Sequence, residues 1–263
     1  MGNKKKLFVI SDVHGFYDEM IKALNEAGFD KDNPSHLLIS CGDNLDRGEK
    51  PREVIEYLSS IENKVLIKGN HDSMFVDMCM RHYPSTDDFY NGTFKTMLDL
   101  NMVNSGKVKP DDFEGYFDSA YRMYKPLIDS MCNFYETKNY IFVHSWIPVK
   151  LVPNHEESDK YVMHLEYYQD WRNADPYAWD EAMWNNPYEY ASERLNQTNK
   201  TMVFGHWHTS WYWSKFKGIG SEDGDDAKFD IVNDEDLKII GIDACTAYTG
   251  KVNVAVLEDE LID

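Results

Sequence analysis

Short strand-like runs alternate with amphipathic stretches in the first part of the chain. The runs cover residues 7–10, 37–41 and 64–68, and polar residues with glycine follow each of them. Runs of this length between loop residues are typical of buried strands. After the first two runs, apolar residues recur at helical spacing, up to Gly28 in one stretch and from Pro51 to about residue 60 in the other. Strand, loop and helix in this order predict parallel strands joined by crossover helices.

A segment of different character, residues 73–136, follows the third run. It is rich in Met and Tyr, with helical patterns at 75–82 and 117–134 and a loop-like centre that contains Asn91-Gly92 and Asn104-Ser105-Gly106. Neither side of the segment offers a linker to a separate domain. We therefore expect this segment to be a helical insertion that covers the functional site. The whole chain, residues 1–263, is then expected to form one domain.

The rest of the chain returns to strands with a second interruption. Strand-like runs lie at 139–143, 201–204, 237–242 and 252–257, and we expect the last two to be closing antiparallel strands around Gly250. Residues 148–199 carry much of the Trp and Tyr and predict an irregular, lid-like aromatic segment. Most of the Trp and Tyr rings of residues 146–213 are expected to serve core or lid packing. The acidic stretch 221–236 is expected to be a solvated loop.

Composition narrows the classes of function. With 46 acidic and 27 basic side chains, the net charge of −19 argues against a protein that binds nucleic acid through its backbone phosphates. Four scattered cysteines without a Cys-x-x-Cys pair favour reduced thiols and no zinc ribbon. No apolar run is long enough for a membrane span, and the basic start leads directly into a strand rather than a signal peptide. We expect a cytoplasmic protein with no membrane partner.

Potential metal ligands follow directly after the predicted strands. They are Asp12, His14, Asp43, Asn70, His71, His144, His206 and His208. Because the carboxyl ends of parallel strands meet at one edge of a sheet, we expect these side chains to gather there. Carboxylate, imidazole and amide oxygen suit divalent Mn, Fe, Zn or Ni. Two such ions bridged by a carboxylate, roughly 3.5–4 Å apart, would clamp a phosphoryl group, and Asp43 is the natural bridge because it has no partner of its own.

The segment Gly42-Asp43-Asn44-Leu45-Asp46-Arg47-Gly48 adds groups for acid–base work and anion binding. Asp46 is placed to orient an acid or base, and the planar fork of Arg47 suits a phosphate. Each group alone also has a structural interpretation: an ordinary Asp-x-His turn, Asn70 as a helix cap, or His144 as a buried histidine with its hydrogen bonds satisfied. Five of the nine histidines fall in these strand-end motifs, and this joint occurrence favours a functional site.

The motifs together resemble the signature of the calcineurin-like metallophosphoesterases. The matching blocks are Asp12-Val13-His14-Gly15, Gly42-Asp43-x-x-Asp46-Arg47-Gly48, Gly69-Asn70-His71-Asp72, Val143-His144-Ser145 and Gly205-His206-x-His208. The Asp46-Arg47-Gly48 extension is similar to the phosphoprotein phosphatase branch, and the chain as a whole resembles its bacterial and phage members, such as lambda phosphatase and symmetrical diadenosine tetraphosphate hydrolases. The resemblance implies a four-layer α/β/β/α sandwich of two mixed sheets with a helical insertion.

The resemblance also implies a role for each motif residue. One metal would be held by Asp12, His14 and Asp43, with His208 as a further ligand. The second would be held by Asp43, Asn70, His144 and His206, with Mn the first expectation for both. His71 would be the general acid, oriented by Asp46. Arg47 would bind the phosphate together with Asn70 and His71, and a metal-bridging hydroxide would attack phosphorus directly.

Several positions depart from the family pattern and leave the substrate open. Asn186 stands where bacterial members often place a second phosphate-binding arginine, a role for which Arg172 and Arg194 are candidates. Thr93 and Trp146 each replace a glycine of the family motifs.

We expect a phosphatase acting on phosphomonoesters, including phosphoserine and phosphothreonine in proteins. The alternative with the same chemistry is a dinucleoside polyphosphate hydrolase, for which the aromatic residues of 146–213 would stack a base. The complete set of metal ligands argues against a third hypothesis, a metal-free interaction module. The negative net charge argues against a fourth, a DNA phosphodiesterase.

Overall fold

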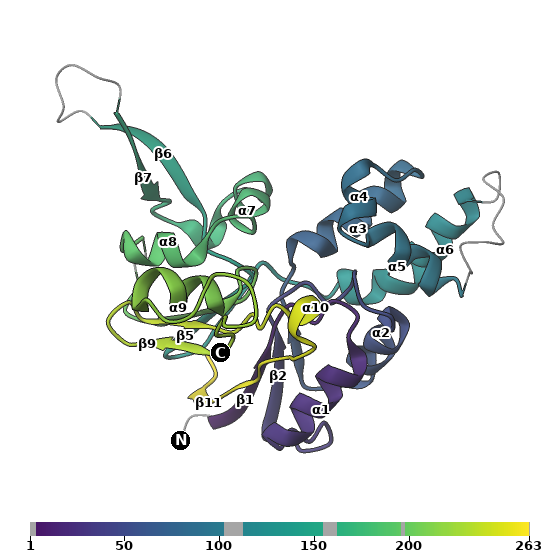
Figure 1. Ribbon diagram of the computed structural model, residues 1–263, viewed down its shortest axis with the longest axis horizontal. Coiled ribbons are helices and arrows are strands. Elements are labelled where there is room, and N and C mark those ends of the chain that lie inside the picture. The colour runs from purple at the N-terminus through teal and green to yellow at the C-terminus, as the bar shows by residue number, and fades with distance from the viewer. Residues whose placement is uncertain (1–3, 103–112, 155–161, 196–197, 263) are drawn as a thin grey trace.

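The computed structural model describes residues 4–102, 113–154, 162–195 and 198–262. Within these ranges the chain forms two mixed sheets with helices on their outer faces (Figure 1). The first sheet has the order β11-β1-β2-β3. Its strands are β1 (Lys4–Ile10), β2 (His36–Ser40), β3 (Lys64–Leu66) and β11 (Ala255–Glu260). The first three are parallel, as the strand and helix pattern predicts, and β11 runs antiparallel to β1.

The second sheet has the order β4-β5-β8-β10-β9. Its strands are β4 (Phe134–Glu136), β5 (Tyr140–Val143), β8 (Thr201–Phe204), β9 (Val232–Asp234) and β10 (Ile239–Gly241). The central three are parallel, and the two edge strands are antiparallel to their neighbours. A separate hairpin of β6 (Val149–Asn154) and β7 (Val162–Tyr167) projects from this side of the molecule (Figure 1).

Side-chain alternation along the strands creates the layers. Leu7 and Val9 point from β1 toward Phe142 and Val203 of the second sheet, so the two sheets share one apolar core. Phe8 and Ile10 point the other way, into the core under the first group of helices. The α/β/β/α sandwich expected from the sequence is confirmed. One apolar core lies between the two sheets, and each sheet packs against its own helices through a further core.

Helices from the first half of the chain cover the outer face of the first sheet. They are α1 (Tyr17–Ala27), α2 (Pro51–Ser60), α3 (Asn70–Arg81), α4 (Thr86–Tyr90), α5 (Thr93–Leu100) and α6 (Phe113–Ile128). The second sheet is covered by α7 (Pro176–Ala182), α8 (Pro187–Ser192) and α9 (Thr209–Lys217), preceded by a 3₁₀ turn at Trp171–Asn173. A short helix α10 (Thr246–Thr249) follows β10. The α2 bounds and the stop of α1 at a left-handed Gly28 confirm the sequence prediction.

Three predictions of local structure are wrong. The expected loop around Asn91-Gly92 is largely helical, since α4 and α5 flank this pair, while Asn104-Ser105-Gly106 lies outside the described residues. The described residues of segment 148–199 form the β6–β7 hairpin, a 3₁₀ turn and two helices rather than irregular structure. The helix expected to run to residue 134 ends at Ile128, and β4 begins at Phe134.

The two closing strands are also placed differently from the prediction. β10 and β11 do not pair with each other around Gly250, because β10 joins the second sheet and β11 joins the first. The acidic stretch 221–236 is mainly exposed or partly exposed, but Val232 is fully buried as the start of β9. No helix among the described residues has the length and apolar character needed to cross a membrane.

Candidate active site

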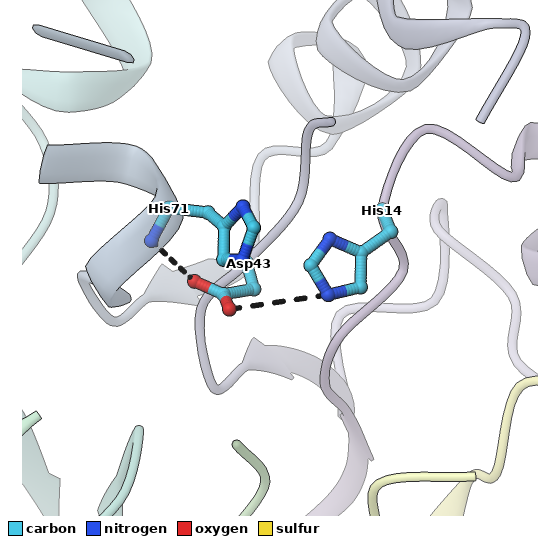
Figure 2. A group of neighbouring side chains, drawn as sticks. All are labelled: His14, Asp43 and His71. Carbon is cyan, nitrogen blue, oxygen red and sulfur yellow. Dashed lines mark hydrogen bonds and ion pairs between the residues drawn. The ribbon is translucent and has the colours of Figure 1, made fainter. Parts of the chain in front are cut away.

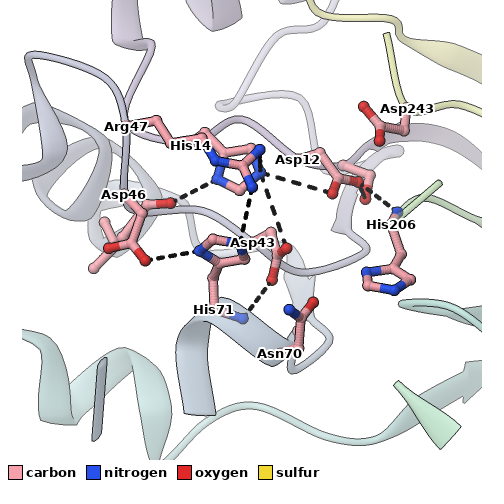
Figure 3. Close-up of polar contacts among 12 residues, drawn as sticks. Asp12, His14, Asp43, Asp46, Arg47, Asn70, His71, His206 and Asp243 are labelled. Carbon is pink, nitrogen blue, oxygen red and sulfur yellow. Dashed lines mark hydrogen bonds and ion pairs between the residues drawn. The ribbon is translucent and has the colours of Figure 1, made fainter. Parts of the chain in front are cut away.

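The predicted ligands meet where strands of both sheets end. Asp12 and His14 follow β1, Asp43 follows β2, and Asn70 with His71 begins α3. From the second sheet come His144 after β5 and His206 after β8. Figure 3 shows the side chains of the first sheet converging, with His206 facing them.

The backbone around these residues is sharply turned. Asp12, His14 and Asp43 have φ angles of 52°, 51° and 55°, in the left-handed region that residues with a side chain rarely adopt. Asp46 and Arg47 follow with φ of 76° and 66°. Several strained residues within one loop cluster are characteristic of functional sites, where the surrounding fold holds them in place.

A first group brings together His14, Asp43 and His71 (Figure 2). Oδ1 of Asp43 accepts a hydrogen bond from the backbone N–H of His71 at 3.0 Å, and Oδ2 lies 4.0 Å from Nε2 of His14. Nδ1 of His14 lies 2.9 Å from the carbonyl oxygen of Leu45. A carbonyl only accepts, so the proton of a neutral His14 is on Nδ1 and the lone pair of Nε2 points into the site.

A second group contains Asp43, His144 and His206. Nδ1 of His144 donates to the carbonyl oxygen of Cys41 at 2.7 Å, which leaves the Nε2 lone pair free. That lone pair faces Oδ1 of Asn70 at 2.8 Å and Oδ2 of Asp43 at 3.5 Å. The Nε2 lone pair thus faces two acceptor oxygens, an arrangement that a cation stabilises.

The titration of these residues agrees with metal binding. Burial lowers the pKa of His144, and lowers that of His14 and His206 well below the usual range, so the imidazoles are neutral ligands. Burial also raises the pKa of Asp12 to about 6 and raises that of Asp43, and the nearby charge of Asp43 on Asp12 and of Asp46 on Asp43 adds to this. Carboxylates that are costly to bury alone, next to neutral imidazoles, form a donor set that fits divalent ions of the Mn, Fe, Zn or Ni type.

His71 of the first group also forms a hydrogen-bonded pair with Asp46. Nδ1 of His71 donates to Oδ2 of Asp46 at 2.7 Å, and both side chains are buried. Burial lowers the pKa of His71, but the charges of Asp43 and Asp46 outweigh it and raise the pKa above the usual value. Nε2 of the same ring lies 3.2 Å from Nη2 of Arg47, whose Nη1 is 3.2 Å from Nε2 of His14. The guanidinium therefore bridges the rings of His71 and His14.

The structure does not bring His208 into either group. Its Nδ1 lies 2.5 Å from Oγ of Ser210, and its Nε2 is 3.8 Å from Oδ1 of Asp223. In an extended segment the side chains of residues 206 and 208 would share one face, but His206 has a φ of 64° and turns the chain between them.

The candidates for a second phosphate-binding arginine also lie elsewhere. Asn186 caps α8, where its side chain accepts from the backbone N–H groups of Tyr188 and Glu189. Arg172 donates to both oxygens of Glu136, at 2.8 and 2.7 Å, and Arg194 is exposed beyond the end of α8. Among the described arginines, only Arg47 hydrogen-bonds to residues of the two groups.

Asp243 is a site residue that sequence reasoning missed. It lies beside Asp12 on the side of His206 (Figure 3), and it is 6% exposed. Burial and the neighbouring Asp12 raise its pKa well above the usual range, and its Oδ1 accepts from the backbone N–H of Cys245 at 2.7 Å. Asp243 follows closely after β10, so the strand-end rule that selected the other ligands would have selected it too.

Comparison with known proteins agrees with this geometry. A segment of 73 residues is 34% identical to serine/threonine-protein phosphatase 2 of Salmonella typhimurium, covering 28% of this chain and 32% of that protein. A segment of 66 residues is 41% identical to the symmetrical bis(5'-nucleosyl)-tetraphosphatase of Salmonella paratyphi B, covering 25% of this chain and 23% of the relative. These matches span no more than about a third of either curated relative.

Similarity of fold extends much further along the chain. The structure of a cold-active protein tyrosine phosphatase superposes with a TM-score of 0.51 at 16% identity, over 97% of this chain and 73% of that one. Residues 5–241 match the sequence profile of the calcineurin-like phosphoesterases. This match includes every predicted ligand, and it shows that the chain belongs to the calcineurin-like phosphoesterase family.

Proposed function

We propose that this chain is a dinuclear metal-dependent phosphatase that hydrolyses phosphomonoesters by direct transfer of the phosphoryl group to water. The observation that supports it most strongly is the arrangement of two ligand groups that share Asp43, with Arg47 and the His71–Asp46 pair alongside. One metal would be held by His14 and Asp43 of the first group together with Asp12, whose Oδ1 lies 4.0 Å from Nε2 of His14, while His71 is kept for proton transfer. The other would be held by Asp43, Asn70, His144 and His206. When bound, divalent ions of this kind neutralise phosphate oxygens and make water a better nucleophile.

The chain's own residues would supply positioning and proton transfer. Arg47 would turn its guanidinium to two phosphate oxygens, since its planar fork matches that geometry. His71 would donate the proton on Nε2 to the leaving oxygen as the bond to phosphorus breaks. Its Nδ1–H remains on Asp46, which fixes the ring and favours the charged imidazolium.

The preferred substrates are phosphomonoesters of small molecules or of phosphoserine and phosphothreonine in proteins. Two cavities of about 250 and 310 Å³ flank Trp184, next to the site. Their walls carry four carboxylates, from Asp77, Asp180, Asp87 and Asp88, against one lysine and one arginine. Together with the net charge of −19, this surface repels a polyphosphate chain more than it repels a single phosphate.

Dinucleoside polyphosphate hydrolysis is the second candidate because of Trp184. The residue is 54% exposed, and its ring lies 6.3 Å from the ring of His206, centroid to centroid. An exposed indole this close to the ligand groups is placed to stack a base.

Metal content and hydrolysis of p-nitrophenyl phosphate after loading with Mn test the proposal. We expect about two ions per chain and activity that chelation removes. Bound metal with no hydrolysis of p-nitrophenyl phosphate, a phosphopeptide or a dinucleoside polyphosphate would contradict the enzymatic function. No metal and no turnover would instead support the interaction module. Rates on the three substrates separate the two candidate activities.

We also expect a cytoplasmic location. All four cysteines are free thiols, which supports a reducing compartment.

A further inference from the structure

Besides His71, Thr93 contacts the carboxylate of Asp46. The hydroxyl of Thr93 donates a hydrogen bond to Oδ2 of Asp46 at 2.6 Å, the same oxygen that accepts from Nδ1 of His71 at 2.7 Å. Thr93 lies 47 positions after Asp46 in the chain and is fully buried. It occupies a position where the motif that this chain resembles has glycine, so the hydroxyl is a feature of this chain.

Asp46 depends on these two donors for its orientation. Its other oxygen, Oδ1, is buried and has no hydrogen-bond partner among the described residues. The terminal torsion of an aspartate is broad, so a carboxylate bound only by His71 can rotate together with the ring. The hydroxyl of Thr93 supplies the second fixed point for that carboxylate.

The fold holds Thr93 firmly in place. It is the first residue of α5, whose Met97 and Leu100 are fully buried in the core. The preceding Gly92 has a φ of 84°, and a Cβ at this position would lie only 2.7 Å from the backbone nitrogen of Arg47. The start of α5 therefore packs closely against the turn that carries Asp46 and Arg47, and only glycine fits at position 92.

We propose that Thr93 is a positioning residue for proton donation: its hydroxyl fixes the Asp46 carboxylate, which in turn aims His71 at the leaving oxygen. This inference rests on the proposed function, because it needs His71 to act as the general acid. The hydroxyl takes no part in the bond changes.

The test compares Thr93→Val with Thr93→Ser and with Thr96→Val as a matched control. Thr96 lies one turn along α5, is equally buried, and its hydroxyl has no hydrogen-bond partner among the described residues. A general acid matters most for poor leaving groups. With Mn-loaded protein, we expect Thr93→Val to lower kcat for phenyl phosphate roughly tenfold, from the loss of one hydrogen bond to a charged group. The loss should be smaller for p-nitrophenyl phosphate, whose leaving group needs little protonation.

The other variants show whether the hydroxyl causes this effect. Thr93→Ser should keep at least about half the wild-type kcat, and Thr96→Val should match the wild type on both substrates. Metal content, KM and melting temperature should remain close to wild type in all three. If Thr93→Val does not fold, Thr93→Ala takes its place with the same expected pattern. Equal losses on both substrates, a loss of metal, or no loss at all would overturn the inference.

A double variant with His71→Asn separates this inference from the proposed function. If Thr93 acts through His71, adding Thr93→Val to His71→Asn should cause no further loss. Additive losses would overturn the positioning role while leaving His71 as the acid. A His71→Asn variant with full activity would contradict the acid role in the proposed function, and no hydrolysis by the wild type would contradict that function as a whole.

Discussion

The two walls of the site differ in how firmly their side chains are held. On the wall built from the first sheet and α5, Asp43, Asp46 and His71 are almost fully buried, and each has at least one hydrogen-bond partner. The opposite wall carries the buried His144 but opens at its rim, where Trp184 is 54% exposed and lies between two acidic cavities. A rigid wall suits bond-breaking chemistry, and an open wall suits the recognition of different substrates. Variants on the two walls should therefore affect different kinetic constants.

The largest effect is expected at the residue shared by both ligand groups. Asp43→Asn should remove both ions and reduce hydrolysis of p-nitrophenyl phosphate by more than about a thousandfold, because the bridging charge is lost. Metal analysis and steady-state rates check this. Full activity with a normal metal content would refute the bridge.

His71→Asn should have the next largest effect. We expect kcat to fall by about 10²- to 10⁴-fold, the usual contribution of a general acid, while the metal content stays at the wild-type value. Metal analysis is the decisive control, because loss of the ions in this variant would contradict the acid role and indicate a structural one.

On the open wall, Trp184→Ala should change KM rather than kcat. If a base stacks on the indole, KM for a dinucleoside polyphosphate should rise roughly tenfold, and KM for p-nitrophenyl phosphate should change little. Trp184→Phe, which keeps an aromatic ring, is the matched control. A rise for a phosphopeptide alone would assign this wall to protein substrates.

The smallest effect is expected away from both walls, at Glu136 on β4. Arg172 donates to both of its oxygens and Lys200 lies 2.7 Å from Oε1, and the hydrogen bonds from Arg172 lower the pKa of Glu136. A lowered pKa stabilises the fold above the ordinary value of 4.5, and this stabilisation is lost as the pH falls through the folded-state pKa.

Glu136→Gln should therefore lower stability at pH 7 by about 0.5–1 kcal/mol, or about 1–3 °C in Tm, with the difference vanishing in acid. Melting curves from pH 3 to pH 8, with the exposed Glu62→Gln as control, measure it. Unchanged activity would confirm that this ion pair is structural. A difference that grew in acid would contradict the assigned sign.

The strand-end motifs could be predicted because two simple rules coincide. Short apolar runs separated by helical patterns identify parallel strands, and the carboxyl ends of such strands meet. These rules were sufficient to predict that Asp12, Asp43 and His144 would come together. The prediction of one domain over residues 1–263 follows from the same pattern and stays a prediction.

The remaining features depend on backbone turns and long-range pairing that local pattern does not encode. The left-handed φ of His206 turns the chain before His208, and nothing in a His-x-His pattern indicates such a turn. The place of β11 beside β1, by contrast, is indicated by charge. β11 carries Glu258 and Glu260 opposite Lys6 and Lys4, so its charges complement the start of the chain rather than β10.

The position of β1 has a consequence for the synthesis of the protein. β1 lies between β2 and β11, so one edge of the strand that leads to Asp12 pairs with residues 255–260. While the chain is still on the ribosome, β1 and β2 can pair, but the other edge of β1 has no partner until that last strand emerges. An open edge of this kind invites pairing with other chains, and closing it requires contact across nearly the full sequence. β1 precedes and β11 follows the other strands described, so the edge of β1 is covered only after about 250 further residues have been made.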